Sequence, residues 1–97
     1  MTEREIQRDV VAFYRKMNFF VAVTSQTRVS RVTPGLPDLV LLHRKLGVVF
    51  HEVKVPRGKL RPEQSEFQRR AVEAGTGYIV GGLREAEAFL RAHGLVA

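Results

Sequence analysis

The sequence predicts an α/β fold in which helices flank one mixed β-sheet. Three observations support this prediction: a first segment with apolar residues at helical spacing, two central β-branched runs joined by a short turn, and a second half that alternates helical and strand patterns. The expected element order is α-β-β-β-α-β-α. The 97 residues are enough for a single domain, spanning 1–97, with a modest core.

The first element is expected to be a helix over residues 3–17. Thr2 and Glu5 have the spacing of a capping box, in which side chains bond the free backbone N–H groups at a helix start. The apolar residues that follow helical spacing, and should form the buried stripe, are Ile6, Val10, Phe13 and Met17.

A short strand over residues 19–23 and a polar loop over residues 24–35 should follow this helix. The loop contains Arg28 and Arg31 but no acidic residue. Such a loop can clamp a phosphate backbone, although flexibility alone would also explain its composition.

A β-hairpin is expected next, with strands over residues 39–42 and 48–55. A register symmetric about the turn between them opposes three pairs of residues, namely Leu42 and Val48, Val40 and Phe50, and Asp38 and Glu52. Because side chains alternate along a strand, all three pairs should lie on one face of the sheet.

The pair of acids suggests a metal site. Directly opposed residues have Cβ atoms about 5 Å apart, and two like charges at that spacing repel unless a cation lies between them. Carboxylate oxygens are ligands that Mg²⁺ prefers, with waters and phosphate oxygens completing its coordination. Lys54 lies two residues beyond Glu52, so it should project from the same face about 7 Å along the strand.

Each of these features also has an ordinary structural explanation. A Pro-Asp dipeptide, here Pro37 and Asp38, is common at the start of a strand. A Glu-x-Lys pattern on a strand is often a solvated charge pair. The combination of opposed acids with a basic loop nevertheless favours a site. The histidines offer a rival catalytic scheme, but His51 should face away from Glu52.

The remaining elements alternate between helix and strand. A turn over residues 56–60 should lead into a helix with Pro62 near its start and Gly75 beyond its end. A short strand over residues 78–80 and a last helix over residues 84–93 complete the order.

Positive charge is concentrated in the segment that carries the proposed site. The chain has 16 Lys and Arg against 10 Asp and Glu, for a formal net charge of +6. Residues 28–61 contain eight of the basic residues and only two acids, Asp38 and Glu52, whereas the rest of the chain is balanced. A polyanion such as DNA or RNA is the natural partner of such a segment.

Composition also excludes several classes of protein. Cysteine is absent, which excludes a disulfide scaffold and a zinc–thiolate site. No apolar run reaches the length of a membrane span, and the N-terminus lacks the apolar region of a signal peptide. We therefore expect a soluble, cytoplasmic protein that does not contact a membrane.

Four stretches of the sequence carry a resemblance to a known family. They are Glu3-Arg4-Glu5-Ile6-Gln7, Gly35-Leu36-Pro37-Asp38, Glu52-Val53-Lys54 and Gly58-Lys59-Leu60-Arg61-Pro62-Glu63-Gln64. With these, nearly the whole chain resembles a stand-alone VRR-NUC domain of the PD-(D/E)XK nuclease superfamily, whose members are similar to restriction endonucleases and Holliday-junction resolvases. The resemblance implies a restriction-endonuclease-like core.

The resemblance also implies roles for particular residues. Asp38 and Glu52 would be metal ligands together with the Val53 carbonyl, Lys54 the catalytic lysine, and Gln64 a helix glutamine that reaches the site. Glu3 would be the acid of the first helix that helps hold the metal, because Glu5 is better explained by its capping box. Where the family usually begins the second helix with Ser or Thr, this chain has Arg61.

The function implied is that of a metal-dependent endonuclease acting on DNA, with Mg²⁺ as cofactor and Mn²⁺ able to substitute. We expect a homodimer that selects branched DNA such as a four-way junction, because a two-fold enzyme can place two sites on a symmetric substrate. The phosphate-contacting residues would be Arg28, Arg31, Arg57, Lys59 and Arg61. The alternatives are a nuclease acting on duplex, nicked or flap DNA in a phage or defence context, and a non-catalytic nucleic-acid-binding module.

Overall fold

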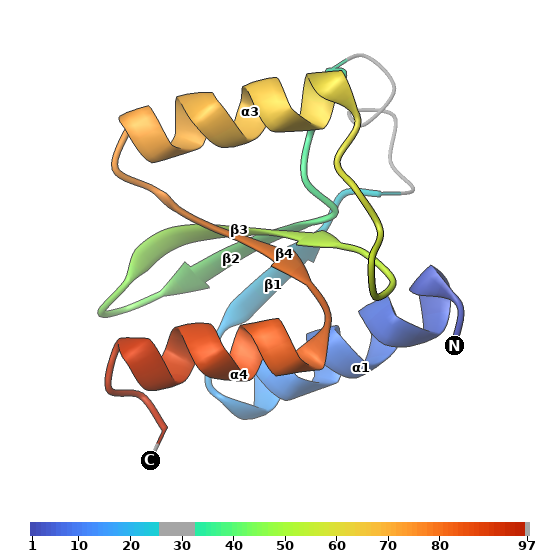
Figure 1. Ribbon diagram of the computed structural model, residues 1–97. Coiled ribbons are helices and arrows are strands. Elements are labelled where there is room, and N and C mark those ends of the chain that lie inside the picture. Colours follow the sequence, from blue (N-terminus) through green and yellow to red (C-terminus); the bar gives the residue numbers. More distant parts are fainter. Residues whose placement is uncertain (26–32, 97) are drawn as a thin grey trace.

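The computed structural model describes residues 1–25 and 33–96. Within these residues the element order is α-β-β-β-α-β-α, which confirms the predicted fold class (Figure 1). The elements are α1 (Glu3–Lys16), β1 (Phe20–Val23), β2 (Leu39–His43), β3 (Gly47–Val53), α3 (Pro62–Glu73), β4 (Gly77–Gly81) and α4 (Leu83–Ala92). Each of these helices is too short or too polar to serve as a membrane span.

The sheet is mixed and its strands lie in the order β1-β2-β3-β4. β1, β2 and β3 pair in an antiparallel manner, and β3 pairs with β4 in parallel. In the central hairpin Val40 lies opposite Phe50 and Leu42 opposite Val48, so the predicted register is confirmed. The pattern of alternating side chains and the short turn were sufficient to fix this register.

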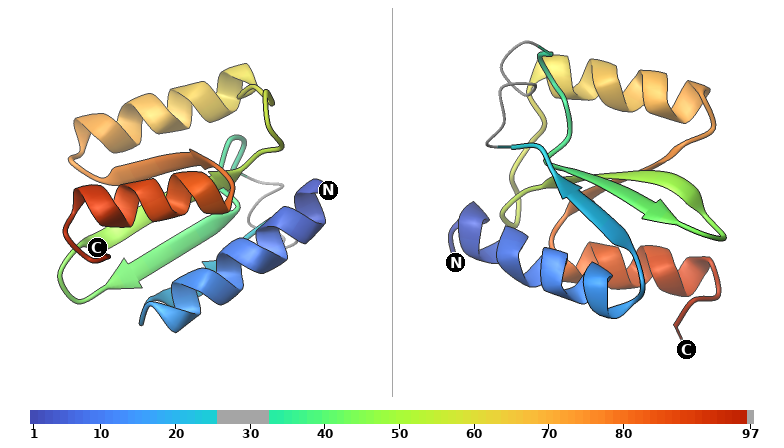
Figure 2. Two further views of the ribbon diagram at one scale, coloured as in Figure 1. Left: turned by 60° about the horizontal axis from the view of Figure 1, so that its bottom comes forward. Right: turned by 180° about the vertical axis from the view of Figure 1, so that it is seen from behind.

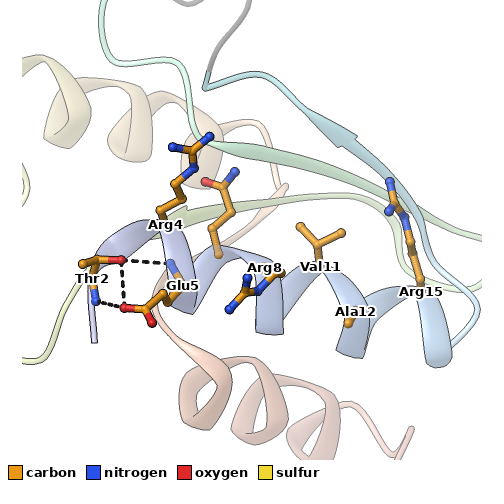
Figure 3. Close-up of a pocket in the computed structure, with 8 residues that line it drawn as sticks. Thr2, Arg4, Glu5, Arg8, Val11, Ala12 and Arg15 are labelled. Carbon is orange, nitrogen blue, oxygen red and sulfur yellow. Dashed lines mark hydrogen bonds between the residues drawn. The ribbon is translucent and has the colours of Figure 1, made fainter.

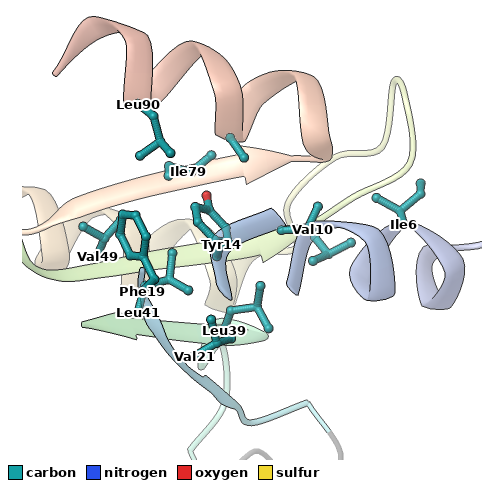
Figure 4. Close-up of a cluster of buried hydrophobic side chains, with 12 residues drawn as sticks. Ile6, Val10, Tyr14, Phe19, Val21, Leu39, Leu41, Val49, Ile79 and Leu90 are labelled. Carbon is teal, nitrogen blue, oxygen red and sulfur yellow. The ribbon is translucent and has the colours of Figure 1, made fainter. Parts of the chain in front are cut away.

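The sheet lies between two layers of helices. α1 and α4 cover one face and α3 covers the other, as the two further views also show (Figures 1 and 2). The main core lies between the sheet and the α1/α4 layer. It is built from Val10 and Tyr14 of α1, Leu39 and Leu41 of β2, and Leu90 of α4, all fully buried (Figure 4).

The buried stripe of α1 differs in part from the sequence prediction. Ile6 and Val10 are buried as expected, but the third buried residue is Tyr14, while Phe13 and Met17 are only partly buried at the margin of the core. A fully buried tyrosine needs a partner for its hydroxyl. Tyr14 has one, because its hydroxyl lies 2.7 Å from Nδ1 of His51 on β3.

α3 covers only part of its face of the sheet. The Phe67 ring packs edge-on against Phe50, with ring centroids 5.1 Å apart. Further along the same face, Phe20, Leu42 and Val48 lie side by side in register across three strands, with exposures of 65%, 45% and 43%. These three residues, here called the apolar row, leave a hydrophobic surface open beside α3.

The helices α1, α3 and α4 begin at the same edge of the sheet, where β3 and β4 end (Figure 1). The N-terminus of a helix carries a partial positive charge and free N–H groups, both of which favour anions. β3 ends at Val53, two residues earlier than expected, although Lys54 N–H still donates to the Gly81 carbonyl at 3.1 Å. Lys54 therefore lies where the sheet gives way to this edge.

Candidate active site

The loop before β2 is packed directly on the start of α3. Gly35 has φ +83, and a Cβ atom there would lie 2.1 Å from the Glu63 carbonyl oxygen, so only glycine fits. On its other side the loop is joined to the end of β1, because Thr24 N–H donates to the Asp38 carbonyl at 2.8 Å and the Thr24 hydroxyl bonds the Pro37 carbonyl. These contacts hold Asp38 at the edge of the sheet.

Asp38 and Glu52 are brought together as the sequence predicts. Glu52 Oε1 accepts a hydrogen bond from the Asp38 N–H at 3.2 Å, and Asp38 Oδ2 accepts one from the Val53 N–H at 2.9 Å. Strand pairing ends one residue earlier, at Leu39 and His51. Beyond the last backbone pair, the two strands are therefore joined by hydrogen bonds from backbone N–H groups to the carboxylates. These bonds hold both acids in position.

Gln64 and Lys54 complete the contacts around Glu52. Gln64 Nε2 donates to Glu52 Oε2 at 2.8 Å, while Gln64 Oε1 accepts from the Arg61 N–H at 2.8 Å. The buried amide thus links the first turn of α3 to the site, and its two bonds fix its orientation. Lys54 Nζ lies 3.9 Å from the same Glu52 oxygen.

The positive charge of Lys54 does not balance the two negative charges of Asp38 and Glu52. Burial raises the pKa of the Asp38 carboxyl, and the charge of nearby Glu3 adds to this effect. Burial and then the negative charge of Asp38 raise the pKa of Glu52 to about 8, against the opposing charge of Lys54. A second cation between the carboxylates would relieve the repulsion that Lys54 alone leaves.

The available donors suit a hard divalent cation. In an extended strand the N–H and C=O groups of one residue point toward the same neighbouring strand. Because the Val53 N–H donates to Asp38 Oδ2, the Val53 carbonyl also faces the side of Asp38. Carboxylate and carbonyl oxygens favour Mg²⁺, Mn²⁺ or Ca²⁺ over softer metals. Over residues 1–25 and 33–96 there is no cluster of three acidic, histidine or cysteine side chains suited to a metal. Glu3 is exposed and acts on Asp38 through its charge, so its role as a ligand stays a prediction.

Three of the five predicted phosphate-contacting residues lie in the described chain, between β3 and α3. Arg57 has the unusual φ of +67 in a turn closed by the Gly58 N–H and the Val55 carbonyl, 2.9 Å apart. Lys59 is exposed. Arg61 begins α3 without a side-chain cap and its guanidinium pairs with Glu63 at 2.7 Å. Arg28 and Arg31 lie outside the described residues.

The structure adds a basic surface that sequence reasoning missed. A hollow of about 450 Å³ runs along α1, and its lining includes Arg4, Arg8 and Arg15 (Figure 3). In the described part of the chain none of these arginines forms an ion pair, and Glu5 beside them is bonded to Thr2 in the predicted capping box. Their spacing along one helix was the available signal.

The basic residues of α3 differ. Arg69 bonds Glu66 and Glu73 at 2.6 to 3.0 Å, and Arg70 bonds Glu66 at 3.0 Å. Positive charge on the outer face of α3 is thus neutralised locally, whereas the charge on α1 is available to a partner.

His51 connects the strand that carries Glu52 to α1 and β4. Its Nδ1 accepts from the Tyr14 hydroxyl at 2.7 Å, and its Nε2–H donates to the Gly81 carbonyl at 3.0 Å. Burial lowers the pKa of His51 to about 4, which keeps the ring neutral. As expected, it faces away from Glu52, and it ties α1, β3 and β4 together directly behind that residue.

Comparison with known proteins identifies the fold. No protein-family model and no curated protein matches the chain. The structure is similar to a solved structure described as a VRR_NUC domain, with a TM-score of 0.75 and 23% sequence identity over 94% of this chain and 95% of that chain. The chain therefore has the fold of a VRR_NUC domain, as its sequence motifs predict.

Proposed function

We propose that the protein is a metal-dependent endonuclease that hydrolyses phosphodiester bonds of DNA. The observation that carries this proposal is the contact set around Glu52. This buried acid meets Asp38, Gln64 and Lys54 at an edge where three helices begin. Two buried acids with a single lysine beside them disfavour folding unless a further cation binds them. Their presence is therefore best explained by a role in catalysis.

The proposed cofactor is Mg²⁺, with Mn²⁺ as a substitute, held by Asp38, Glu52 and the Val53 carbonyl. When bound, it would supply Lewis-acid activation of the phosphate and a more acidic water. The role proposed for Lys54 is to neutralise charge that develops on the phosphate in the transition state. Gln64 would keep the Glu52 carboxylate in position. Glu3 would help to hold the metal from α1.

The proposed substrate is DNA because basic groups follow Lys54 along the chain and line the hollow on α1. Arg57, Lys59 and Arg61 follow Lys54 along the chain, and Arg28 and Arg31 are proposed to contact phosphates from the loop before β2. The hollow along α1 would hold a further stretch of backbone. Arg4 and Arg15 are eleven residues apart, which corresponds to about 16 Å along a helix.

The contribution of α1 can be measured through salt dependence. We expect Arg8→Ala and Arg15→Ala each to reduce the slope of log affinity against log salt by about 0.9, the value for one phosphate contact. Arg70→Ala on α3 is the matched control, because its charge is already paired with Glu66. Equal effects of all three substitutions would remove α1 from the DNA-binding surface.

We further propose that the active species is a homodimer selective for branched DNA. The apolar row of Phe20, Leu42 and Val48 supports this, because a flat exposed hydrophobic surface is suited to a second copy of the chain. A two-fold dimer would present two sites to a symmetric four-way junction.

Two other functions are separated from this one by a single experiment. A nuclease for duplex, nicked or flap DNA would cut those substrates in preference to a junction, and a non-catalytic module would bind all of them and cut none. The experiment incubates each DNA with protein and Mg²⁺, Mn²⁺ or EDTA and maps the products. Paired cuts on the junction that need metal support the proposal, and uncut DNA in every condition overturns it.

A further inference from the structure

A second cavity opens beside Lys54 on the side of the sheet that carries α1 and α4. It has a volume of about 580 Å³, within the usual range for small-ligand sites. The start of α1, the turn after β3, the end of β4 and the start of α4 enclose it. Its apolar walls include Ile6, Pro56 and Leu83. Its charged lining residues are three basic ones, Lys54, Arg57 and Arg84, and two acids, Asp9 and Glu85.

Two glycines, Gly81 and Gly82, let side chains of α1 and α4 pack closely against this end of β4. A Cβ atom on Gly81 would lie 2.5 Å from Glu85 Oε1, and one on Gly82 would lie 3.0 Å from Ile6 Cγ2. Glu85 Oε1 also accepts the Gly82 N–H at 2.8 Å, so the start of α4 is already capped. The apolar walls of the cavity, rather than the N–H groups of the helix start, are therefore the surface offered to a ligand.

Lys54 joins this cavity to the candidate active site. It lines the cavity, and its Nζ lies 3.9 Å from Glu52 Oε2. Lys54 is therefore shared by the candidate active site and the cavity wall. Arg57 and Arg84 line the same cavity, and guanidinium groups are suited to phosphates.

The conformation of Arg57 supports a ligand here. Pro56 and Arg57 occupy the central positions of the turn, and the second of these has φ +67, where glycine is the usual residue. An arginine in this conformation costs backbone energy that glycine avoids. A guanidinium used for binding at the mouth of the cavity gives a reason for that cost.

We propose that this cavity binds an unstacked nucleobase of the nucleotide next to the scissile phosphate. The inference rests on the proposed function and names its substrate more closely, because a base inside a continuous duplex can enter only after it has been unstacked and unpaired. Unpaired nucleotides at a branch point, a flap or a strand end can enter without the cost of unstacking. The cavity would thus select DNA structure through one base.

The test uses branched DNA in which 2-aminopurine replaces one base at a time across the branch point, in EDTA so that no cleavage intervenes. This base becomes more fluorescent when it leaves the stack. The variant is Leu83→Glu, which places a carboxylate on the cavity wall. Leu83 is the first residue of α4 and is 38% exposed, so an acid there suits the helix start and the fold should survive.

Val72→Glu on α3 is the control, because it also replaces an apolar residue with glutamate, at a position that is 62% exposed and lines neither cavity. We expect protein binding to raise the fluorescence at one position severalfold, and Leu83→Glu but not Val72→Glu to abolish the rise. An abasic site at that position should weaken DNA binding by the original protein by about tenfold, a typical value for one base contact. The abasic site should not weaken DNA binding by Leu83→Glu.

The outcomes separate this inference from the proposed function. If no position responds, or if Leu83→Glu behaves as Val72→Glu does, the cavity does not hold a base even though metal-dependent cleavage persists. Additive losses from Leu83→Glu and the abasic site would show that the new charge acts on the DNA elsewhere, which also overturns the proposal. If the protein binds no DNA at all, the proposed function fails and the inference fails with it.

Discussion

Asp38→Asn should make the protein more stable in the absence of metal, although it removes a proposed ligand. Asp38 Oδ2 accepts the Val53 N–H, and the amide oxygen of asparagine can accept the same bond. The substitution therefore keeps the local hydrogen bond and removes one of two adjacent negative charges. A residue retained only for structure would lose stability instead.

The magnitude follows from the arrangement of charges. Two like charges about 5 Å apart repel by about 3 kcal/mol at an effective dielectric constant near 20. Lys54, 3.9 Å from Glu52, offsets part of this. We expect a net gain of about 1–2 kcal/mol at pH 9, which in a domain of this size raises Tm by roughly 5–10 °C.

The gain should depend on pH. The folded-state pKa of Glu52 is raised by burial and by Asp38 from 4.5 to about 8, so the folded protein binds a proton that the unfolded chain releases. Stability of the original protein should consequently fall as pH rises from about 4.5 to about 8 and then level off. At pH 5 Glu52 is protonated in the fold, the repulsion is absent, and Asp38→Asn should have little effect.

The assay is thermal unfolding followed by circular dichroism at pH 5 and pH 9 in EDTA. Asp9→Asn, at an exposed acid of α1, is the control for a change of net charge. Addition of Mg²⁺ should stabilise the original protein by about 1.4 kcal/mol at ten times its Kd and leave Asp38→Asn unchanged. A loss of stability in Asp38→Asn that is equal at both pH values would refute the electrostatic account of the site.

Three further predictions concern the remaining parts of the site. Lys54→Ala should lose turnover but still bind Mn²⁺ in a calorimetric titration, and a loss of Mn²⁺ binding would contradict the division of roles. Arg57→Gly should change stability by less than about 1 kcal/mol, because glycine suits φ +67, yet reduce the salt slope of DNA binding by about 0.9. Phe20→Glu should convert a dimer to a monomer in light scattering, and an unchanged mass would exclude the apolar row as the interface.

The sequence was most informative where the structure is local. The register of the central hairpin follows from alternation and a short turn, and it aligns Asp38 with Glu52. The capping box of α1 also follows from two residues three apart. The contact between Gln64 and Glu52 was expected only through resemblance to a family, because nothing in the chain between them fixes how α3 lies on the sheet.

Features that depend on how elements dock could not be predicted. Gly35 looks like an ordinary turn residue until the loop meets the Glu63 carbonyl of α3. Tyr14 replaced Phe13 in the buried stripe because His51 supplies its hydroxyl with a partner. The cavity beside Lys54 arises from three separate segments, so no pattern within any one of them indicates it.

The most direct test of the central claim is cleavage of a labelled four-way junction with Mg²⁺ by the original protein and by Asp38→Asn. The account predicts cleavage by the original protein and none by the variant. The variant should also bind the junction at least as tightly, since it has lost a charge that repels phosphate. Cleavage by Asp38→Asn at the original rate would contradict the assignment of Asp38 and Glu52 as the catalytic metal site.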